Sequence, residues 1–281
     1  SSSKWWDFGR KQGGLFVFTP TITNDNAFWY RGTADAIAQN LNFLKKKNNT
    51  PKLPYTTEVH CHVLPGIDDG SPDVEHSLAL IHQMKEWGLE RIIATPHVTE
   101  ASFENTPQTI GSAYSRLCQE TNLDELGIKL CYSAEYRMDD NFLGILQREE
   151  IIPMPGNHIL IENSFLQPFW NIKSLVFDLQ IKGLSPILAH PERYAYYYDD
   201  KKIYKELHEQ GCEFQVNLLP LAGYYNKRAK EVAEWLISKQ MVDYLGSDLH
   251  NSSHVLHINK YLSGKEYPKH MRNIHIKNNH L

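Results

Sequence analysis

The chain has 281 residues, which is enough to bury the core of one α/β barrel, so we expect a single catalytic domain. Its content of 41% hydrophobic and 22% charged residues is typical of a globular protein, and no apolar run is long enough to insert into a membrane. The net charge of −4 argues against a general attraction to nucleic acid, so an anionic substrate would need local arginine or metal cations.

The cysteines and the first residues bear on the cellular compartment. Four cysteines lie far apart and form no CxxC pair, so we expect neither a zinc ribbon nor a disulfide framework. The first residues lack the basic and apolar regions of a signal peptide. A reducing cytoplasm is therefore the expected location.

The predicted elements begin after an N-terminal extension or linker, residues 1–55, which shows no sustained hydrophobic period. From Thr57 onward, short β-rich runs alternate with amphipathic segments, as in βα units. We expect strands at 57–60, 91–95, 130–134, 159–161, 186–189, 214–216 and 242–245. Helices are expected to begin with the caps Ser71-Pro72 and Thr106-Pro107 and to span 172–181, 201–210 and 227–239. These elements place the catalytic domain at residues 56–265, and residues 266–281 are expected to be a disordered C-terminal tail.

About seven strands in βα alternation suit either a closed parallel barrel or an open doubly wound sheet. No GxGxxG or GxxxxGK[ST] motif follows a predicted strand, so the phosphate-binding loops of nucleotide-binding open sheets are absent from the sequence. The predicted fold is therefore an α/β barrel.

Possible metal ligands stand at or just beyond the carboxyl end of nearly every predicted strand. In a parallel barrel these ends converge on one face, where the active site forms. Imidazole and carboxylate ligands suit divalent Mn, Fe, Zn or Mg, and more ligands than one ion can use indicate two or three ions. Clustered cations would supply a hydroxide nucleophile for hydrolysis of a phosphoester. The candidate ligands are His60, His62, Asp69, His97, Glu135, Glu162, His190, Asp248 and His250.

Each candidate alone has a simpler explanation. His60 and His62 share one side of an extended strand, but HxH patterns are common by chance. Asp69 would otherwise be a turn residue, and Glu162 would otherwise form a buried salt bridge. Arg193, one short loop after a proposed ligand, could bind phosphate or form a structural ion pair. The joint placement of these residues, and not any one of them, favours a phosphoesterase.

The motifs that carry these residues resemble the PHP (polymerase and histidinol phosphatase) superfamily, and within it the bacterial protein-tyrosine phosphatases of the CpsB/CapC/YwqE type. They run in order through most of the chain. The matching motifs are His60-Cys61-His62, Asp68-Asp69-Gly70, Ala94-Thr95-Pro96-His97, Ala134-Glu135, Leu160-Ile161-Glu162, Ala189-His190-Pro191-Glu192-Arg193 and Gly246-Ser247-Asp248-Leu249-His250.

The resemblance implies a distorted (β/α)7 barrel with three divalent metal ions per chain, with Mn as the first choice and Fe, Zn, Mg or Co as the alternatives. It implies that the nine candidates are metal ligands, that Glu162 bridges two ions and that Arg193 binds phosphate. The implied substrate is phosphotyrosine on a membrane-associated bacterial tyrosine kinase that controls capsule or exopolysaccharide synthesis. Relatives can carry a second arginine after the last DxH motif, where this chain has Asn251-Ser252-Ser253-His254, so His254 is a candidate substitute.

Three other functions stay open at this stage. A small-molecule phosphatase, such as one acting on histidinol phosphate, would use the same metal chemistry. A catalytically degenerate regulatory module is possible because folds outlive particular functions, although the complete ligand set argues against it. A metal-dependent nuclease is the third, and neither the net charge nor any basic stripe supports it.

Overall fold

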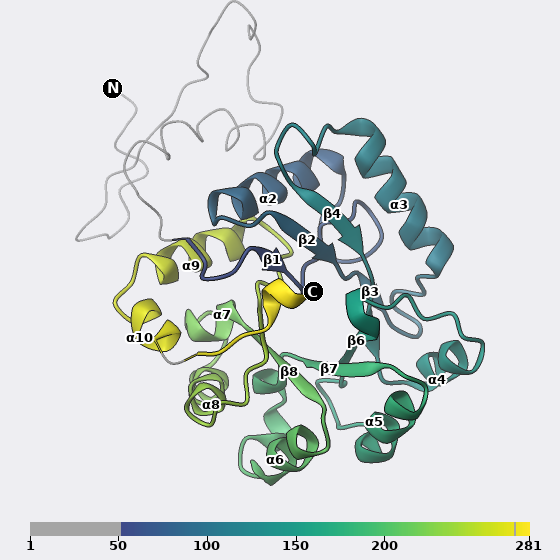
Figure 1. Cartoon of the computed structure of the whole chain (residues 1–281), viewed down its shortest axis with the longest axis vertical. Coiled ribbons are helices and arrows are strands. Elements are labelled where there is room, and N and C mark those ends of the chain that lie inside the picture. Colours follow the sequence, from purple (N-terminus) through teal and green to yellow (C-terminus); the bar gives the residue numbers. More distant parts are fainter. Residues whose placement is uncertain (1–51, 273) are drawn as a thin grey trace, which may run out of the picture. The chain divides into compact units, whose positions relative to one another are not determined.

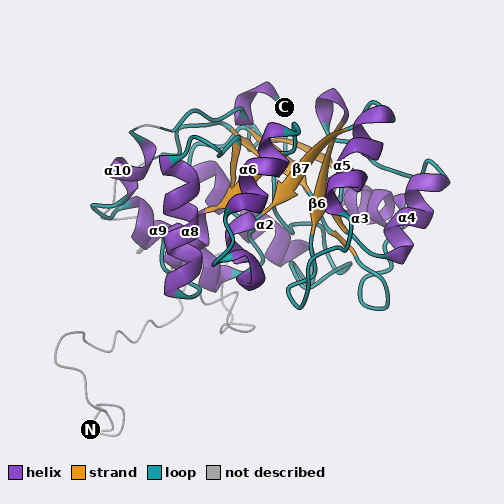
Figure 2. Cartoon of the chain, turned by 90° about the horizontal axis from the view of Figure 1, so that it is seen from below, coloured by secondary structure: helices purple, strands orange, loops and turns teal. Residues whose placement is uncertain are grey.

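The computed structural model describes residues 52–272 and 274–281, which belong to one compact unit. Residues 1–51 of the expected N-terminal extension lie outside the described residues. In the described part, parallel strands lie at the centre and helices surround them (Figure 1 and Figure 2). No helix among these residues is both long and apolar enough to cross a membrane.

The strands form two parallel sheets that together close a ring. β1 (Thr57–Glu58), β2 (Arg91–Ala94) and β4 (Lys129–Tyr132) pair in the order β1-β2-β4. The other sheet has the order β3-β5-β6-β7-β8-β9 and consists of β3 (His97–Val98), β5 (Glu135–Arg137), β6 (His158–Glu162), β7 (Ser185–Ala189), β8 (Glu213–Asn217) and β9 (Tyr244–Gly246).

Closure follows from three features of these strands. β2 and β3 are successive pieces of one strand, as are β4 and β5, so the strands occupy seven positions. A parallel bridge between Cys61 and Leu249 joins the segment after β1 to the segment after β9. This ring agrees with the expected distorted (β/α)7 barrel.

Successive side chains along the strands point to opposite faces and so belong to two separate hydrophobic clusters. Ile92 packs outward against the helices, whereas Ile93 packs inward, and Leu160 points inward between two outward neighbours. A side-chain period of two is expected for strands that are buried on both faces. The inner cluster is Val59, Ile93, Met154, Leu160, Ile187, Ala189, Tyr244 and Leu281.

The helices follow the predicted order, with one correction. α5 (Ile172–Ile181) has the predicted bounds, and α3 (Pro107–Glu120) begins at Thr106 with a capping box. The first helix is capped by Asp73, whose carboxylate accepts from the His76 amide at 2.9 Å, so the expected cap at Ser71-Pro72 is wrong. The remaining helices are α2 (Val74–Glu86), α4 (Asp140–Gln147), α6 (Lys202–Glu209), α7 (Leu218–Leu221), α8 (Lys227–Ser238), α9 (Ser252–Leu262) and α10 (Tyr267–Met271). Short 3-10 turns span η3 (Pro155–Asn157), η4 (Pro191–Arg193), η5 (Ala195–Tyr197) and η6 (Asn278–His280).

Residues 266–281 were expected to form a disordered tail, and this expectation is wrong for the part that the structure describes. The Asn278 side chain is fully buried, donates to the carbonyls of Thr57 and Leu245, and accepts from the Leu245 amide. Leu281 joins the inner cluster of the barrel, and the chain end lies over the centre of the strands in Figure 1. The segment therefore covers the end of the barrel where the strands begin.

Replacing Asn278 should show how much this segment stabilises the barrel. We expect Asn278→Ala to lower the free energy of unfolding by about 1–3 kcal/mol, because it leaves three buried backbone groups of β1 and β9 without their partner. Urea denaturation followed by circular dichroism measures the change. His280→Ala, an exposed site in the same turn, is the control. Equal stability of the two variants would contradict the anchoring role.

Candidate metal centre

The ends of the strands bring the predicted ligands together at one end of the barrel. Glu162 follows the inward-facing Leu160 by two residues, so the alternation that fills the core also turns this carboxylate inward. Glu135 begins β5, the strand beside β6. Both glutamates are 0% exposed. An ionised carboxylate at such a position requires a cation or strong hydrogen bonds.

All nine predicted ligands fall into groups that could hold a metal ion, and in each group the possible ligand atoms lie within 4.8 Å of one another. His60, His62, His97 and Glu135 each belong to two groups. Shared ligands are the expected arrangement for several ions at one site. The groups are His62, Asp69, His97 and His250; His60, His62 and Asp248; His60, Glu135 and His190; and His97, Glu135 and Glu162.

Hydrogen bonds to the outer nitrogens orient two of the imidazoles. His60 Nδ1 lies 2.6 Å from Gln215 Oε1, and His62 Nδ1 lies 2.8 Å from Asp68 Oδ2. The two Nε2 atoms are 3.4 Å apart. An acceptor on one ring nitrogen fixes the tautomer and leaves the other nitrogen for a metal, as in most protein metal sites.

Several buried ligand atoms lack a hydrogen-bond partner. Glu162 Oε1 accepts from Arg137 Nε at 2.9 Å, so the alternative salt bridge exists, but Glu162 Oε2 has no hydrogen-bond partner among the described residues and lies 3.7 Å from His190 Nε2. Glu135 Oε2 and His190 Nδ1 also lack a hydrogen-bond partner in this part of the chain, although Glu135 Oε2 lies 2.9 Å from His97 Nδ1. Unsatisfied buried polar atoms are rare and costly. Metal coordination would satisfy them, so these residues fit a divalent-ion centre.

The pKa shifts of the buried candidate ligands also favour a metal site. Burial and the neighbouring Glu135 carboxylate raise the pKa of Glu162 to about 7. Burial lowers the pKa of His190 to about 4, which keeps this imidazole neutral as a metal ligand must be. Divalent cations would relieve the repulsion between the two glutamates.

Two of the candidate ligands have a backbone conformation that residues other than glycine rarely adopt. His190 has φ 32° and Asp248 has φ 49°, both in the left-handed region. The Asp248 amide donates to the His60 carbonyl at 2.8 Å, which helps to hold the turn. Non-glycine residues in this region cluster at functional sites because the surrounding fold must enforce them.

A cleft of about 310 Å³ opens over these ligands. Arg193 is the one arginine or lysine among the described residues that line it, and its guanidinium donates to Asp248 Oδ2 at 2.9 Å. The guanidinium carbon lies 4.5 Å from the centre of the Phe165 ring and 4.4 Å from that of Tyr225. Because only one N–H group of Arg193 is used by Asp248, its other in-plane donors remain available for an anion.

His254 also lines the cleft and is 7% exposed. Its Nδ1 lies 3.3 Å from the His250 amide nitrogen and 3.3 Å from the Asp248 carbonyl oxygen. Burial, and then the nearby His250, lower its pKa to about 4. At neutral pH this side chain is therefore an uncharged imidazole, not a second cation in place of the missing arginine.

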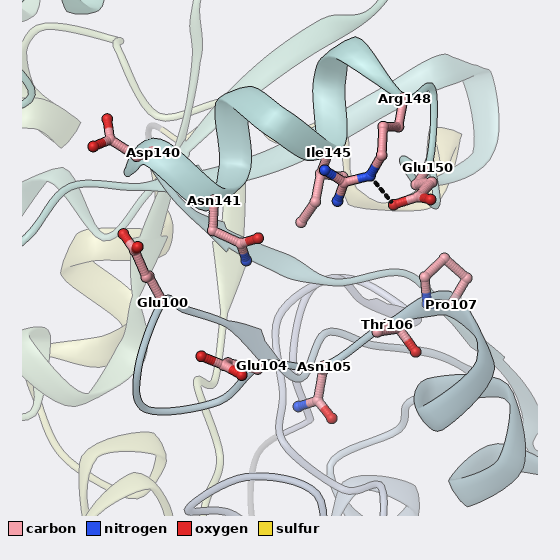
Figure 3. A pocket seen from close by; sticks show the side chains of 10 residues that line it. All are labelled: Glu100, Glu104, Asn105, Thr106, Pro107, Asp140, Asn141, Ile145, Arg148 and Glu150. Atoms are coloured by element: carbon pink, nitrogen blue, oxygen red, sulfur yellow. Dashed lines mark hydrogen bonds and ion pairs between the residues drawn. The ribbon is translucent and has the colours of Figure 1, made fainter.

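A second hollow, of about 480 Å³, lies at the starts of α3 and α4 (Figure 3). It contains none of the predicted ligands, and its wall includes Glu100, Glu104 and Asp140. Asn105, which also lines it, donates to the His97 carbonyl at 2.9 Å. This hollow is thus joined to the metal centre through the backbone of a ligand loop.

Several residues that hold the site have little or no signal in the sequence. Asp68 belongs to a turn motif, and its place beside Asp69 is the one signal that points to it. Gln215 on β8 is bound to His60, and Tyr225 covers Arg193, but no local pattern marks either of them. Their roles depend on contacts between segments that are far apart in the chain.

Removing the acceptor on His62 should weaken metal binding. Asp68 also accepts from the His97 and Gly70 amides, at 3.2 Å and 3.0 Å, so it supports two ligand loops. We expect Asp68→Ala to raise the metal dissociation constant roughly 10- to 100-fold. Competition with a chromogenic chelator measures it, and Asp124→Ala at an exposed site is the control. An unchanged constant in a folded variant would rule out the orienting role.

Comparison with known proteins identifies the family. The tyrosine-protein phosphatase YwqE of Bacillus subtilis is 28% identical over 195 residues, which cover 69% of this chain and 77% of that protein. The tyrosine-protein phosphatase CpsB of Streptococcus agalactiae is 26% identical and covers 69% of this chain and 82% of its own length. A solved structure from work on YwqE of Bacillus subtilis and CpsB of Streptococcus pneumoniae, described as metal-dependent tyrosine phosphatases, superposes with a TM-score of 0.65 at 26% identity, over 79% of this chain and 96% of that one. Residues 56–280 match the family described as capsular polysaccharide synthesis, CpsB/CapC, and the chain therefore belongs to that family.

Proposed function

We propose that this chain is a metal-dependent protein-tyrosine phosphatase. The observation that carries the proposal is the convergence of nine candidate ligands beneath a cleft that contains Arg193. The names of the relatives support the same substrate class. We infer that the nine residues bind three divalent ions, Mn before Fe, Zn, Mg or Co, with Glu162 as a bridge.

Different residues of the chain have different roles in the proposed reaction. Divalent ions held by the nine residues would supply a hydroxide nucleophile from water near neutral pH and would offset phosphoryl charge. Arg193 binds two phosphoryl oxygens through its in-plane N–H groups, while Phe165 and Tyr225 prevent its rotation. His254, as a neutral imidazole, donates a hydrogen bond to the phosphoryl group where relatives can have arginine.

The family description also supports a proposal about the partner. The substrate is phosphotyrosine on a protein that acts in capsule or exopolysaccharide synthesis, and we infer a membrane-associated bacterial tyrosine kinase. A cytoplasmic location suits such a partner and stays a prediction.

Metal removal tests the proposed activity directly. We expect the metal-stripped protein to release no phosphate from a tyrosine-phosphorylated peptide and to regain activity when Mn²⁺ is added, because the ligand set holds the ions that activate water. Malachite green detection of phosphate measures both states. Faster release from histidinol phosphate than from the peptide would indicate a small-molecule phosphatase. No phosphate release with any divalent metal would indicate a catalytically degenerate regulatory module.

Arg193 should contribute mainly to phosphate binding. We expect Arg193→Ala to lower kcat/KM for the phosphopeptide roughly 10- to 100-fold, because a charge-assisted hydrogen bond contributes about 1.5–3 kcal/mol. Arg193→Lys should recover only part of this loss, since lysine lacks the planar fork. Arg228→Ala, at an exposed arginine on α8, is the control. Metal content must be measured in each variant because Arg193 also contacts Asp248. Unchanged kinetics with full metal content would contradict the role.

A further inference from the structure

The loop between β6 and α5, residues 163–171, leaves the metal centre directly after Glu162 and is tied down at its base. Asn163 donates its amide to Tyr194 Oη at 3.0 Å and accepts from the Phe169 amide at 2.9 Å. Tyr196 Oη donates to the Ser164 carbonyl at 2.8 Å. Both tyrosines follow Arg193 in the chain, so the loop is fixed to the segment that supplies the phosphate-binding arginine.

This anchored loop presents apolar side chains to solvent. Leu166 is 93% exposed, Trp170 is 84% exposed and Phe165 is 40% exposed. A single exposed leucine needs no explanation, but three large apolar residues within six positions on an ordered loop form a patch. Phe165 also lines the cleft and covers the Arg193 guanidinium. The patch therefore includes one residue of the cleft wall, and Leu166 follows that residue directly in the chain.

The size of the cleft limits what can lie within it. About 310 Å³ is at the lower end of the range for ligand pockets, so it suits one phosphorylated side chain. The neighbouring residues of a polypeptide substrate must then cross the rim. The loop that supplies Phe165 to the cleft also carries the exposed Leu166 and Trp170, within five residues of Phe165 in the chain. A small phosphomonoester would end inside the cleft and would not reach these side chains.

We propose that Leu166 and Trp170 bind apolar residues that flank the phosphotyrosine in a protein substrate. The inference rests on the proposed tyrosine phosphatase function and adds the element that selects polypeptides over small phosphoesters. Apolar contacts of this kind act on substrate binding, since they lie outside the reacting centre. The loop needs no rearrangement to make them, because its base is already fixed by the three hydrogen bonds.

The test compares two substrates on the full chain with its metals bound. One is p-nitrophenyl phosphate, and the other is a phosphotyrosine peptide with leucine and phenylalanine on either side. We expect Leu166→Ala/Trp170→Ala to lower kcat/KM for the peptide roughly 10-fold, mainly through KM, which corresponds to about 1.4 kcal/mol of lost apolar contact. Hydrolysis of p-nitrophenyl phosphate should change less than about 2-fold.

The matched control is Phe177→Ala/Ile181→Ala, which removes two exposed apolar residues of α5, 55% and 72% exposed. This variant should act on both substrates like the parent. A second peptide with serine in the flanking positions should lose the difference between parent and loop variant.

Each other outcome has a separate meaning. Equal losses on both substrates would mean that the loop shapes the cleft, which overturns the proposal. A loop variant as active on the peptide as the parent would overturn it too. A parent chain that hydrolyses neither substrate would refute the tyrosine phosphatase function itself, and the loop proposal with it.

Discussion

Two glutamates, Glu135 at the start of β5 and Glu162 at the end of the neighbouring β6, are buried beside each other, and the rest of this end of the barrel is arranged around them. Burying one unpaired carboxylate costs several kcal/mol, and two together repel each other. The fold surrounds them with His60, His97 and His190, while Arg137 bonds one oxygen of Glu162. Among the described residues, Glu135 Oε2 and Glu162 Oε2 have only imidazole nitrogens as ion-pair neighbours and form no hydrogen bond, so both are atoms that a divalent cation would bind. The site is therefore built for cations that the protein itself does not supply.

Much of this could be predicted from local pattern. The strand alternation that places Leu160 in the inner cluster also places Glu162 at the centre, so a run of apolar residues that ends in a carboxylate predicts both strand and ligand. The helix at 172–181 follows from its apolar spacing, and Thr106-Pro107 predicts a helix start because the cap and the proline act within one turn. Predictions succeeded where the deciding interaction lies within a few residues.

The failures have the opposite character. Asp73 and Ser71 are both residues that cap helices well, and they are two positions apart, so local preference does not decide between them. Residues 274–281 have the composition of a polar tail, and only the backbone of β1 and β9, far away in the sequence, gives Asn278 its partners. Gln215 and Tyr225 are likewise marked by no local sequence pattern. Local pattern thus predicts the candidate ligands that the fold brings together better than it predicts the residues that orient them.

The two ends of the barrel have different roles: one is a packed apolar interior, and the other carries the candidate metal ligands. At the end where the strands begin, the interior is apolar, and Leu281 completes it beside Tyr244 and Leu160. At the other end the same strands present imidazoles and carboxylates, and two ligands, His190 and Asp248, keep a left-handed backbone. Such strain persists only where surrounding structure over-determines it. The well-packed apolar end can therefore be regarded as the support that lets the opposite end hold buried charge and strained turns in one fixed geometry.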